Sequence, residues 1–313
     1  MSPEFPTVAV LLAAFNGALW LGEQLDSILA QGGVRVSVFI SVDPSTDGTQ
    51  ALCLEYTQRH SNVHLLPSAG PFKGAARNFF RLIRDVDFST YDYVSFSDQD
   101  DIWYPDKLER AVAKLRSGDI QGYSSNVVAF WPDGRRMLID KAQPQVQWDY
   151  LFEAAGPGCT YMLTPALAAQ FKDLIITRWN TVQSVALHDW FCYAFARSHG
   201  FRWFIDPEPG MDYRQHQSNE VGVNAGFASA LRRVRRVFDG WWFSQIAIVS
   251  SLAGGDERPG ALNSRLIQKA PLRLILNSRQ CRRRPRDRLA FAFICLGYSF
   301  MGRTLDVDLR REE

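Results

Sequence analysis

Three carboxylates stand within four positions of this sequence, directly after an apolar segment. Asp98, Asp100 and Asp101 follow residues 92–97, which have the composition of a buried strand. Carboxylates this close repel one another, so the cluster suggests a bound cation. Mg²⁺ and Mn²⁺ prefer oxygen ligands, and an extended segment places Asp98 and Asp100 on the same side. A helix cap is the alternative, but a cap uses only one carboxylate.

Alternating strand and helix patterns position this cluster. The expected strands are residues 7–15, 34–43, 62–66 and 92–97, and the expected helices are 19–31, 49–60, 75–85 and 105–117. Such alternation with short connections predicts an α/β fold, a mainly parallel sheet flanked by helices on both faces. In such sheets ligands bind at the carboxyl ends of the strands.

Polar clusters follow three of the expected strands. They are Asn16-Gly17, residues 43–48 and residues 98–101, and the fold places all three along one rim of the sheet. Asp43 and Asp47 could be simple turn formers. Their place on the same rim as the three aspartates favours a ligand role.

The sequence contains neither of the common glycine-rich motifs that bind nucleotide phosphates. A phosphorylated ligand would therefore need a metal ion and scattered basic groups for charge neutralisation. The basic residues available for this are Lys73, Arg77 and Arg214, although each residue of this type is more often a surface charge.

Two later segments contain histidines beside polar residues. Asp189, in the triplet 188–190, could cap a helix, or it could act as a general base that takes a proton from a hydroxyl. His216 could be structural, or it could give a nitrogen ligand to a carboxylate-bound metal.

Composition limits the class of protein. The chain has 313 residues, 46% of them hydrophobic, and its five cysteines are scattered without metal-binding spacing. We therefore expect neither a disulfide framework nor a zinc site, and a reducing cytoplasm fits best. The N-terminal apolar run has no basic segment before it and is expected to be a strand. No apolar run reaches the roughly 18 residues of a membrane-spanning helix.

The net charge of +2 conceals an asymmetry. Residues 231–313 contain 17 basic against 8 acidic side chains, whereas residues 1–230 contain 18 against 25. We place a domain boundary near residue 226, so that residues 1–226 form the first domain and residues 227–313 a basic, amphipathic helical region.

Two kinds of partner are open for this basic region. No DNA- or RNA-reading motif occurs, so nucleic acid is not expected. Arginines beside Trp241, Trp242 and Phe243 favour an anionic membrane surface, bound through residues 231–290. A helical hairpin on the body of the protein or a homodimer contact is the alternative.

Several segments, in order over residues 7–225, resemble glycosyltransferase family 2. They are 8–31, 41–49, 96–108, 188–191 and 213–222. The acidic segment with the later His-Asp-Trp and Tyr-Arg-Gln-His is similar to the bacterial rhamnosyltransferase-like branch. Members often have an acidic residue where this chain has His188, and His is frequent there in this branch. The resemblance implies the inverting GT-A fold, with a variable helical extension after the catalytic domain.

The resemblance also implies a role for each motif residue. Asp189 would be the catalytic base, and Asp100 would hold Mg²⁺ or Mn²⁺ with Asp98 and His216. The donor would be bound by Asn16, Asp43, Asp47, Lys73, Arg77, Asn78, Asp98 and Arg214. The acceptor side would comprise Gly158, Cys159, Thr160, His188 and Trp190. We place Asp101 and Trp103 with them, but Asp101 could instead be a second metal ligand or a partner for a nearby base, and Trp103 either packs the loop or faces a sugar.

The activity so implied is transfer of a sugar from a nucleotide sugar to a hydroxyl of a glycan or lipid-linked acceptor in cell-surface polysaccharide synthesis. dTDP-β-L-rhamnose is the leading donor, and UDP- or GDP-hexoses are alternatives. A metal-dependent phosphohydrolase or nucleotidyltransferase could use the same carboxylates but would not need Asp189. A non-catalytic binding protein would show no turnover. The implied location is the cytoplasm, with peripheral attachment to the inner face of the plasma membrane.

Overall fold

The computed structural model describes residues 5–216, 240–254 and 271–300, which form two compact units. Among the described residues, the first unit contains 5–142, 155–189 and 201–216. The second unit contains 143–154, 190–200, 240–254 and 271–300.

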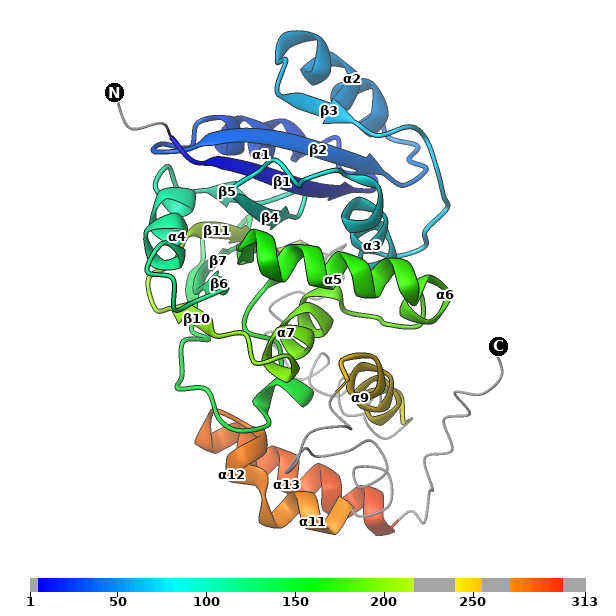
Figure 1. The fold of residues 1–313 in the computed structure, drawn as a ribbon, viewed down its shortest axis with the longest axis vertical. Helices are drawn as coiled ribbons and strands as arrows, with labels where there is room; N and C mark the ends of the chain where they lie inside the picture. Colours follow the sequence, from blue (N-terminus) through cyan, green and yellow to red (C-terminus); the bar gives the residue numbers. More distant parts are fainter. Residues whose placement is uncertain (1–4, 217–239, 255–270, 301–313) are drawn as a thin grey trace. The chain divides into compact units, whose positions relative to one another are not determined.

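The first unit is built on a seven-stranded sheet with the order β10-β6-β9-β4-β1-β2-β3. All its strands run parallel except β9, which pairs antiparallel with both β4 and β6. The strands are β1 (Thr7–Ala14), β2 (Arg35–Val42), β3 (Val63–Leu65), β4 (Tyr93–Ser97), β6 (Gly122–Ser125), β9 (Met162–Leu163) and β10 (Trp203–Asp206). Figure 1 shows β3 beside β2 at one edge of this sheet. The α/β fold class is confirmed.

Helices cover both faces of this sheet because its central strands are apolar on both faces. All residues from Val8 to Ala14 are buried. Val8, Val10 and Leu12 belong to the same core as Leu21, Leu25 and Ile28 of α1. Helix α3 packs against β1 and β2, and α5 packs against β4. The helices of this unit are α1 (Leu21–Leu29), α2 (Thr49–Arg59), α3 (Ala75–Asp85), α4 (Lys107–Leu115), α5 (Pro165–Thr177) and α6 (Trp179–Val182).

A second sheet of four strands, which the sequence pattern did not predict, has the order β5-β11-β7-β8. Its strands are β5 (Ile102–Trp103), β7 (Val127–Phe130), β8 (Arg136–Ile139) and β11 (Met211–Arg214). Strand β5 directly follows the acidic segment, and β11 comes just before His216. This sheet therefore brings the late histidine next to the early aspartates.

Two later segments, residues 121–131 and 156–164, each have the composition of a single strand, but the structure interrupts both. Residues 121–131 form β6 and β7, which belong to different sheets and are separated by buried Asn126. The Asn126 side chain donates to the Pro207 carbonyl at 2.8 Å and accepts the Lys141 N–H at 2.6 Å, so it holds the chain where it changes sheet. Residues 156–164 form a 3₁₀ turn (Gly158–Thr160) and the short β9 in place of one continuous strand.

Helix α7 (His188–Ser198) contributes its first two residues to the first unit and its remainder to the second. The other described helices of the second unit are α9 (Trp241–Leu252), α11 (Pro271–Leu276), α12 (Ser278–Cys281) and α13 (Pro285–Phe300), and residues 149–151 form a 3₁₀ turn. The boundary predicted near residue 226 lies outside the described residues. The second unit also takes in 143–154 and 190–200, so a division at a single position remains a prediction.

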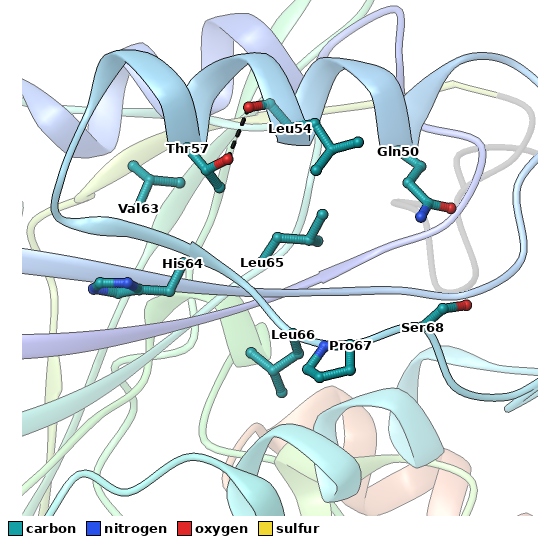
Figure 2. A pocket seen from close by; sticks show the side chains of 9 residues that line it. All are labelled: Gln50, Leu54, Thr57, Val63, His64, Leu65, Leu66, Pro67 and Ser68. Carbon is teal, nitrogen blue, oxygen red and sulfur yellow. Dashed lines mark hydrogen bonds between the residues drawn. The ribbon is translucent and has the colours of Figure 1, made fainter.

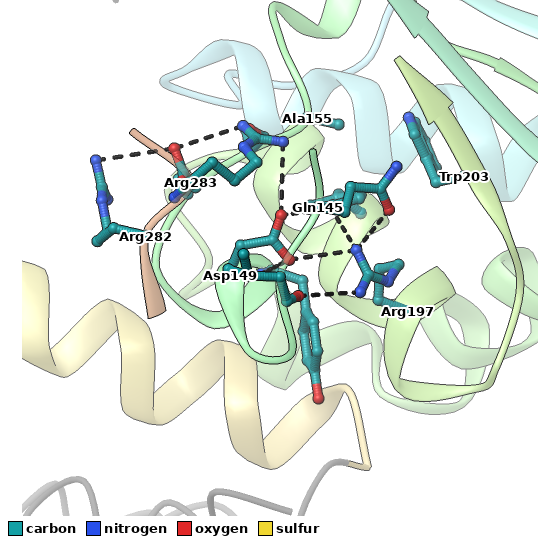
Figure 3. A network of polar contacts seen from close by, with 12 residues as sticks. Gln145, Asp149, Ala155, Arg197, Trp203, Arg282 and Arg283 are labelled. Atoms are coloured by element: carbon teal, nitrogen blue, oxygen red, sulfur yellow. Dashed lines mark hydrogen bonds and ion pairs between the residues drawn. The ribbon is translucent and has the colours of Figure 1, made fainter. Parts of the chain in front are cut away.

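The second unit contains a buried ionic network around Asp149 (Figure 3). Arg197 Nη1 lies 3.2 Å from Asp149 Oδ1, and Arg283 Nη1 lies 3.6 Å from Asp149 Oδ2. The side chains of Asp149 and Arg283 have no exposed surface. Tyr193 of α7 donates its hydroxyl to the same carboxylate at 2.9 Å. The network thus ties residues 145–154, α7 and the start of the C-terminal helices to one another.

None of the described helices combines the length and apolar character needed to cross a membrane.

We expect Arg283→Met to lower the free energy of unfolding by about 3–5 kcal/mol, since it leaves part of a buried ion network without its counter-charge. The measurement is chemical denaturation of the full chain. Arg286→Met is the matched control, because Arg286 is 84% exposed in its pair with Asp287 and should change stability by less than about 1 kcal/mol. An equal loss of unfolding free energy in the two variants would contradict a stabilising role of the buried network.

Candidate active site

The loop after β1 is held to the loop after β2 by side-chain hydrogen bonds. Asn16, at φ 45°, accepts the Thr46 N–H through Oδ1 at 2.9 Å and donates its own N–H to Ser45 Oγ at 3.0 Å. Asp47 accepts the N–H groups of Ala18 and Thr49 at 3.0 and 3.1 Å. Burial opposes ionisation of Asp47, but these hydrogen bonds and that from the Thr49 hydroxyl keep its pKa below the usual value. Asn16 and Asp47 therefore shape this rim.

Asp43 lies directly after β2 and is largely buried. One carboxylate oxygen accepts the Phe72 N–H at 2.8 Å, and the other accepts the Lys73 N–H at 3.1 Å. The carboxylate thereby holds the loop that precedes α3. Gly70 in this loop has φ 110°, and a Cβ there would lie 2.9 Å from Asp43 Oδ1, so glycine is needed for the close approach. The structure thus brings together Asp43 and Lys73, as the sequence predicts.

Asn78 and Arg77 are neighbours in α3, but Asn78 is buried and Arg77 is exposed. Asn78 is buried, and its amide nitrogen donates to the Ser41 carbonyl at 3.0 Å while its oxygen accepts the Ser41 hydroxyl. Its amide is used to fasten α3 to β2, so the predicted donor contact of Asn78 finds no support in this geometry. Arg77 is exposed and donates from Nε to the Gln183 carbonyl at 2.9 Å.

Gln99, between the predicted aspartates, is a residue that sequence reasoning missed. Its side-chain amide forms two hydrogen bonds with the backbone of Phe15, one from the Phe15 N–H at 2.8 Å and one to the Phe15 carbonyl at 2.9 Å. The acidic segment is therefore fastened to the end of β1. A Cβ at position 17 would lie 2.1 Å from Gln99 Oε1, which explains Gly17. The only signal in the sequence is an uncharged residue between two aspartates.

Asp100 and His216 form the most specific polar contact of the site. Asp100 Oδ2 lies 2.7 Å from His216 Nε2, and the imidazole stacks on Trp20 with ring centroids 4.0 Å apart. Asp98 is half-buried two residues earlier. The structure thus brings Asp100 and His216, two of the predicted metal ligands, into contact.

Arg214 holds this place together from β11. Its N–H donates to Asp101 Oδ1 at 3.1 Å, its Nε donates to the Asp100 carbonyl at 2.7 Å, and its Nη2 pairs with Glu23. The guanidinium also lies over Phe130, 4.7 Å from the ring centre. Arg214 was predicted to bind the donor, but these contacts commit it to the protein, so its role in this structure is to hold Asp100 and Asp101.

Asp101 has no exposed surface. Burial, together with repulsion from Asp100 and Asp98, raises its pKa well above the usual range. Asp98, Asp101 and Cys159 place possible ligand atoms within 4.8 Å of one another. Burial also raises the pKa of Cys159, and a neutral thiol is a poor ligand for Mg²⁺ or Mn²⁺. Asp101 and Cys159, which are both buried, are therefore a support beneath the site.

Lys107 completes this support. It is buried, with Nζ 3.2 Å from the centre of the Trp103 ring, and burial lowers its pKa to about 7. Trp103, Cys159 and Thr160 are themselves buried. The predicted acceptor-side positions Asp101, Trp103, Cys159 and Thr160 thus lie beneath the surface. Trp103 belongs to β5, and Cys159 and Thr160 belong to the 3₁₀ turn, elements too short to detect in the sequence.

Asp189 lies in the first turn of α7, half-buried. His188 beside it is buried and stacks on Phe79, with ring centroids 3.8 Å apart. Burial lowers the pKa of His188 to about 3, so its imidazole is neutral. Gly158 faces this turn, since a Cβ there would lie 2.6 Å from His188 Nε2 and 3.0 Å from Asp189 Cβ. His188 and Gly158 therefore fix the position of Asp189.

Trp190, also predicted on the acceptor side, belongs to the second unit. It is buried, and its indole N–H donates to the Tyr150 carbonyl at 2.8 Å. This is a core position, which does not support a contact with an acceptor.

A surface hollow beside α2 and β3 is a different feature (Figure 2). Its lining contains none of the predicted site residues, and the Thr57 hydroxyl in it donates to the Leu54 carbonyl at 2.8 Å. It is lined by Gln50, Leu54, Thr57, Val63, His64, Leu65, Leu66, Pro67 and Ser68. We assign no chemistry to it.

Comparison with known proteins identifies the family. Residues 9–178 match the model of glycosyl transferase family 2. The chain belongs to this family. A curated relative, the dTDP-rhamnosyl transferase RfbG of Shigella flexneri, is 46% identical over 246 residues, which cover 78% of this chain and 85% of RfbG. The resemblance seen in the sequence is thus confirmed, and this protein is a glycosyltransferase.

Other relatives of this glycosyltransferase are more distant. The amylovoran biosynthesis glycosyltransferase AmsB of Erwinia amylovora is 31% identical over 72% of this chain and 77% of AmsB. Among solved structures, the mannosyltransferase PcManGT of Pyrobaculum calidifontis, in complex with GDP-Man and Mn²⁺, has a TM-score of 0.55 at 16% identity over 97% of this chain and 77% of that one. TarS 1–349 of S. aureus, in complex with UDP-GlcNAc, has a TM-score of 0.55 at 13% identity over 78% and 66%. These structures confirm the GT-A fold.

His188 makes a testable contribution to the pH dependence of stability. Its pKa is lower in the folded protein than in the unfolded chain, so the unfolded state binds a proton first as the pH falls below about 6.5. At pH 5.5 this costs the folded glycosyltransferase about 1.4 kcal/mol relative to neutral pH.

We therefore expect His188→Phe, which keeps a stacked ring, to remove about 1.4 kcal/mol of the stability lost between pH 7.5 and 5.5. Denaturant unfolding at both pH values measures this, and comparing the loss within each protein cancels the packing change. An identical loss in both proteins would show that His188 is not buried in its neutral form.

Proposed function

We propose that this glycosyltransferase transfers L-rhamnose from dTDP-β-L-rhamnose to a hydroxyl of a glycan or lipid-linked acceptor in cell-surface polysaccharide synthesis. The observation that supports this donor is the 46% identity to the dTDP-rhamnosyl transferase RfbG, over most of both chains. We further propose that the reaction takes place in the cytoplasm, with the enzyme attached peripherally to the inner face of the plasma membrane.

The reaction is a displacement at C1 of the donated sugar. The acceptor oxygen forms a bond to C1, and the bond from C1 to the diphosphate oxygen breaks, so that dTDP leaves with the electron pair and the configuration inverts. In this proposal the Asp189 carboxylate takes the proton of the acceptor hydroxyl. The first turn of α7, fixed by stacked His188 and by the close approach of Gly158, supports this role because it keeps the carboxylate in one position.

Asp43 and the loop that it holds would form the nucleotide side of the donor site. The carboxylate is fastened to the N–H groups of Phe72 and Lys73, which places Lys73 beside the rim. Lys73 and Arg77 are both exposed, and so available to neutralise a diphosphate.

The residues around Asp100 fit a divalent cation. With bonds of about 2.1 Å, two adjacent ligand atoms of an octahedral ion lie about 3 Å apart. The 2.7 Å between Asp100 Oδ2 and His216 Nε2 is close to this separation, and half-buried Asp98 lies two residues earlier in the chain. We propose that Asp100, Asp98 and His216 hold Mg²⁺ or Mn²⁺. The ion, when bound, supplies stabilisation of the negative charge on the leaving diphosphate.

Purified protein incubated with Mg²⁺ or Mn²⁺ and a panel of nucleotide sugars tests the donor. We expect dTDP-rhamnose to be hydrolysed slowly, with release of dTDP, and at least about tenfold faster than UDP-glucose or GDP-mannose. Preference for a UDP- or GDP-sugar would overturn the donor assignment. Release of inorganic phosphate or pyrophosphate in place of the nucleoside diphosphate would overturn the reaction class.

The same assay distinguishes the loss of the catalytic base from the loss of donor binding. We expect Asp189→Asn to lower turnover with an acceptor by about 10²-fold or more, while dTDP-rhamnose binding remains within about twofold of the wild type. Unchanged transfer by Asp189→Asn would show that another group takes the proton.

Asp100 and Asp101 should differ in their effect on the metal. We expect Asp100→Asn to weaken Mn²⁺ binding at least about tenfold, measured by calorimetry in the presence of dTDP. Asp101→Asn should weaken it by less than about threefold, since an amide oxygen can still accept the Arg214 N–H. The opposite order would make Asp101 a metal ligand. Thermal unfolding of both variants controls for misfolding.

A further inference from the structure

Helix α13 has apolar side chains on two opposite faces, but the described residues cover only one. Phe291, Cys295 and Tyr298 are buried, with Phe291 against Phe152 and Tyr298 against Phe243. On the other face, the exposed apolar side chains have helical spacing. Their exposed fractions are 67% for Leu289, 72% for Phe293 and 39% for Leu296. A helix that is apolar all round is normally covered all round, so this second face is suited to a partner.

Basic residues adjoin this apolar face at one end. Arg286 is 84% exposed and lies one turn before Leu289, on the same side of the helix. Of the six arginines from Arg279 to Arg288, Arg279 and Arg286 are exposed, whereas Arg283 is buried and paired with Asp149, and residues 289–300 carry no charge. The partner must therefore offer both an apolar layer and negative charge.

The aromatic residues that the sequence predicts for membrane contact are not those that the structure exposes. Phe243 of α9 is fully buried, and Trp242 packs against Phe152 and Phe291. The arginines at 232–236 lie outside the described residues. The apolar and basic surface found among the described residues belongs instead to α13.

We propose that the outward face of α13 lies on an anionic lipid surface. Leu289, Phe293 and Leu296 enter the boundary between headgroups and acyl chains, and exposed Arg286 at the start of the helix meets lipid phosphates. The 16-residue helix is about 24 Å long, shorter than the hydrocarbon core, so it lies along the surface.

A second copy of the chain fits this face less well. Among the described residues, the acid near this face is Asp287, which is half-buried and already pairs with Arg282 and Arg286. The described part of an interface between two such faces would therefore bring in no further acid for exposed Arg286.

This inference deepens the proposed function, because it names the surface by which the enzyme would reach a membrane-held acceptor. The test of this inference uses neither donor nor acceptor. The inference about α13 and the proposed function can therefore fail separately. If vesicles are not bound but dTDP-rhamnose is still hydrolysed, only the inference about α13 is wrong. If vesicles are bound but a different donor is used, only the donor proposal is wrong.

The experiment is flotation of the full chain with vesicles of phosphatidylglycerol and phosphatidylcholine in equal parts. We expect binding that weakens at high salt, and binding at least about tenfold weaker to vesicles of phosphatidylcholine alone. The variant Leu289→Ser with Phe293→Ser should lose at least about tenfold in affinity for the mixed vesicles. Arg286→Ser should reduce binding most clearly at low salt.

Ile176→Ser is the matched control, since Ile176 is an exposed apolar residue on α5, in the first unit, and its replacement should leave vesicle binding unchanged. Circular dichroism and thermal unfolding establish that the α13 variants fold. Equal loss with Ile176→Ser, or undiminished binding by the folded Leu289→Ser with Phe293→Ser variant, would overturn the inference. So would a dimer in light scattering that these two substitutions dissociate while no vesicle binding is seen.

Discussion

The site depends on one constraint, the stable placement of three carboxylates at the end of the buried strand β4. The three carboxylates have different surroundings. Asp100 faces His216 at 2.7 Å, Asp101 is fully buried where its charge is suppressed, and Asp98 remains half-exposed. Repulsion between like charges is thus reduced by unequal surroundings. A segment with three similarly solvated aspartates would lack this division of roles.

Arg214 and Gln99 keep that arrangement in place from two sides. Gln99 reproduces the hydrogen bonds of a neighbouring strand toward Phe15, so the segment continues to be fastened to β1 after the sheet pairing ends. Arg214 binds the backbone of Asp100 and the carboxylate of Asp101, and His216 follows two residues later. The histidine therefore reaches Asp100 because Arg214 has already joined β11 to the acidic segment.

Sequence reasoning predicted β1 to β4 of the central sheet because these strands are bounded segments rich in apolar residues, as in residues 7–14. It could not predict the second sheet, since β5 has two residues and β11 four, too few for any periodicity to be detected. For residues on these short elements, the contacts in the structure differ from the roles predicted from the sequence. Arg214 and Trp103 look like ligand residues in the sequence, but one holds the backbone and the other lies beneath Lys107.

The C-terminal helices show a similar limit for apolar residues. Arginine next to tryptophan reads the same in a sequence whether the ring enters a membrane or a protein core, because both environments remove it from water. Phe243 and Phe293 are both phenylalanines in basic surroundings, yet one is fully buried and the other is 72% exposed. What separates them is the set of neighbours on each helix face. Phe291, on the opposite side of α13 from Phe293, already fills the contact with Phe152 and Trp242. Among the described residues the inner face of α13 is therefore occupied, and the exposed outer face is the one that we propose for a partner that is both apolar and anionic.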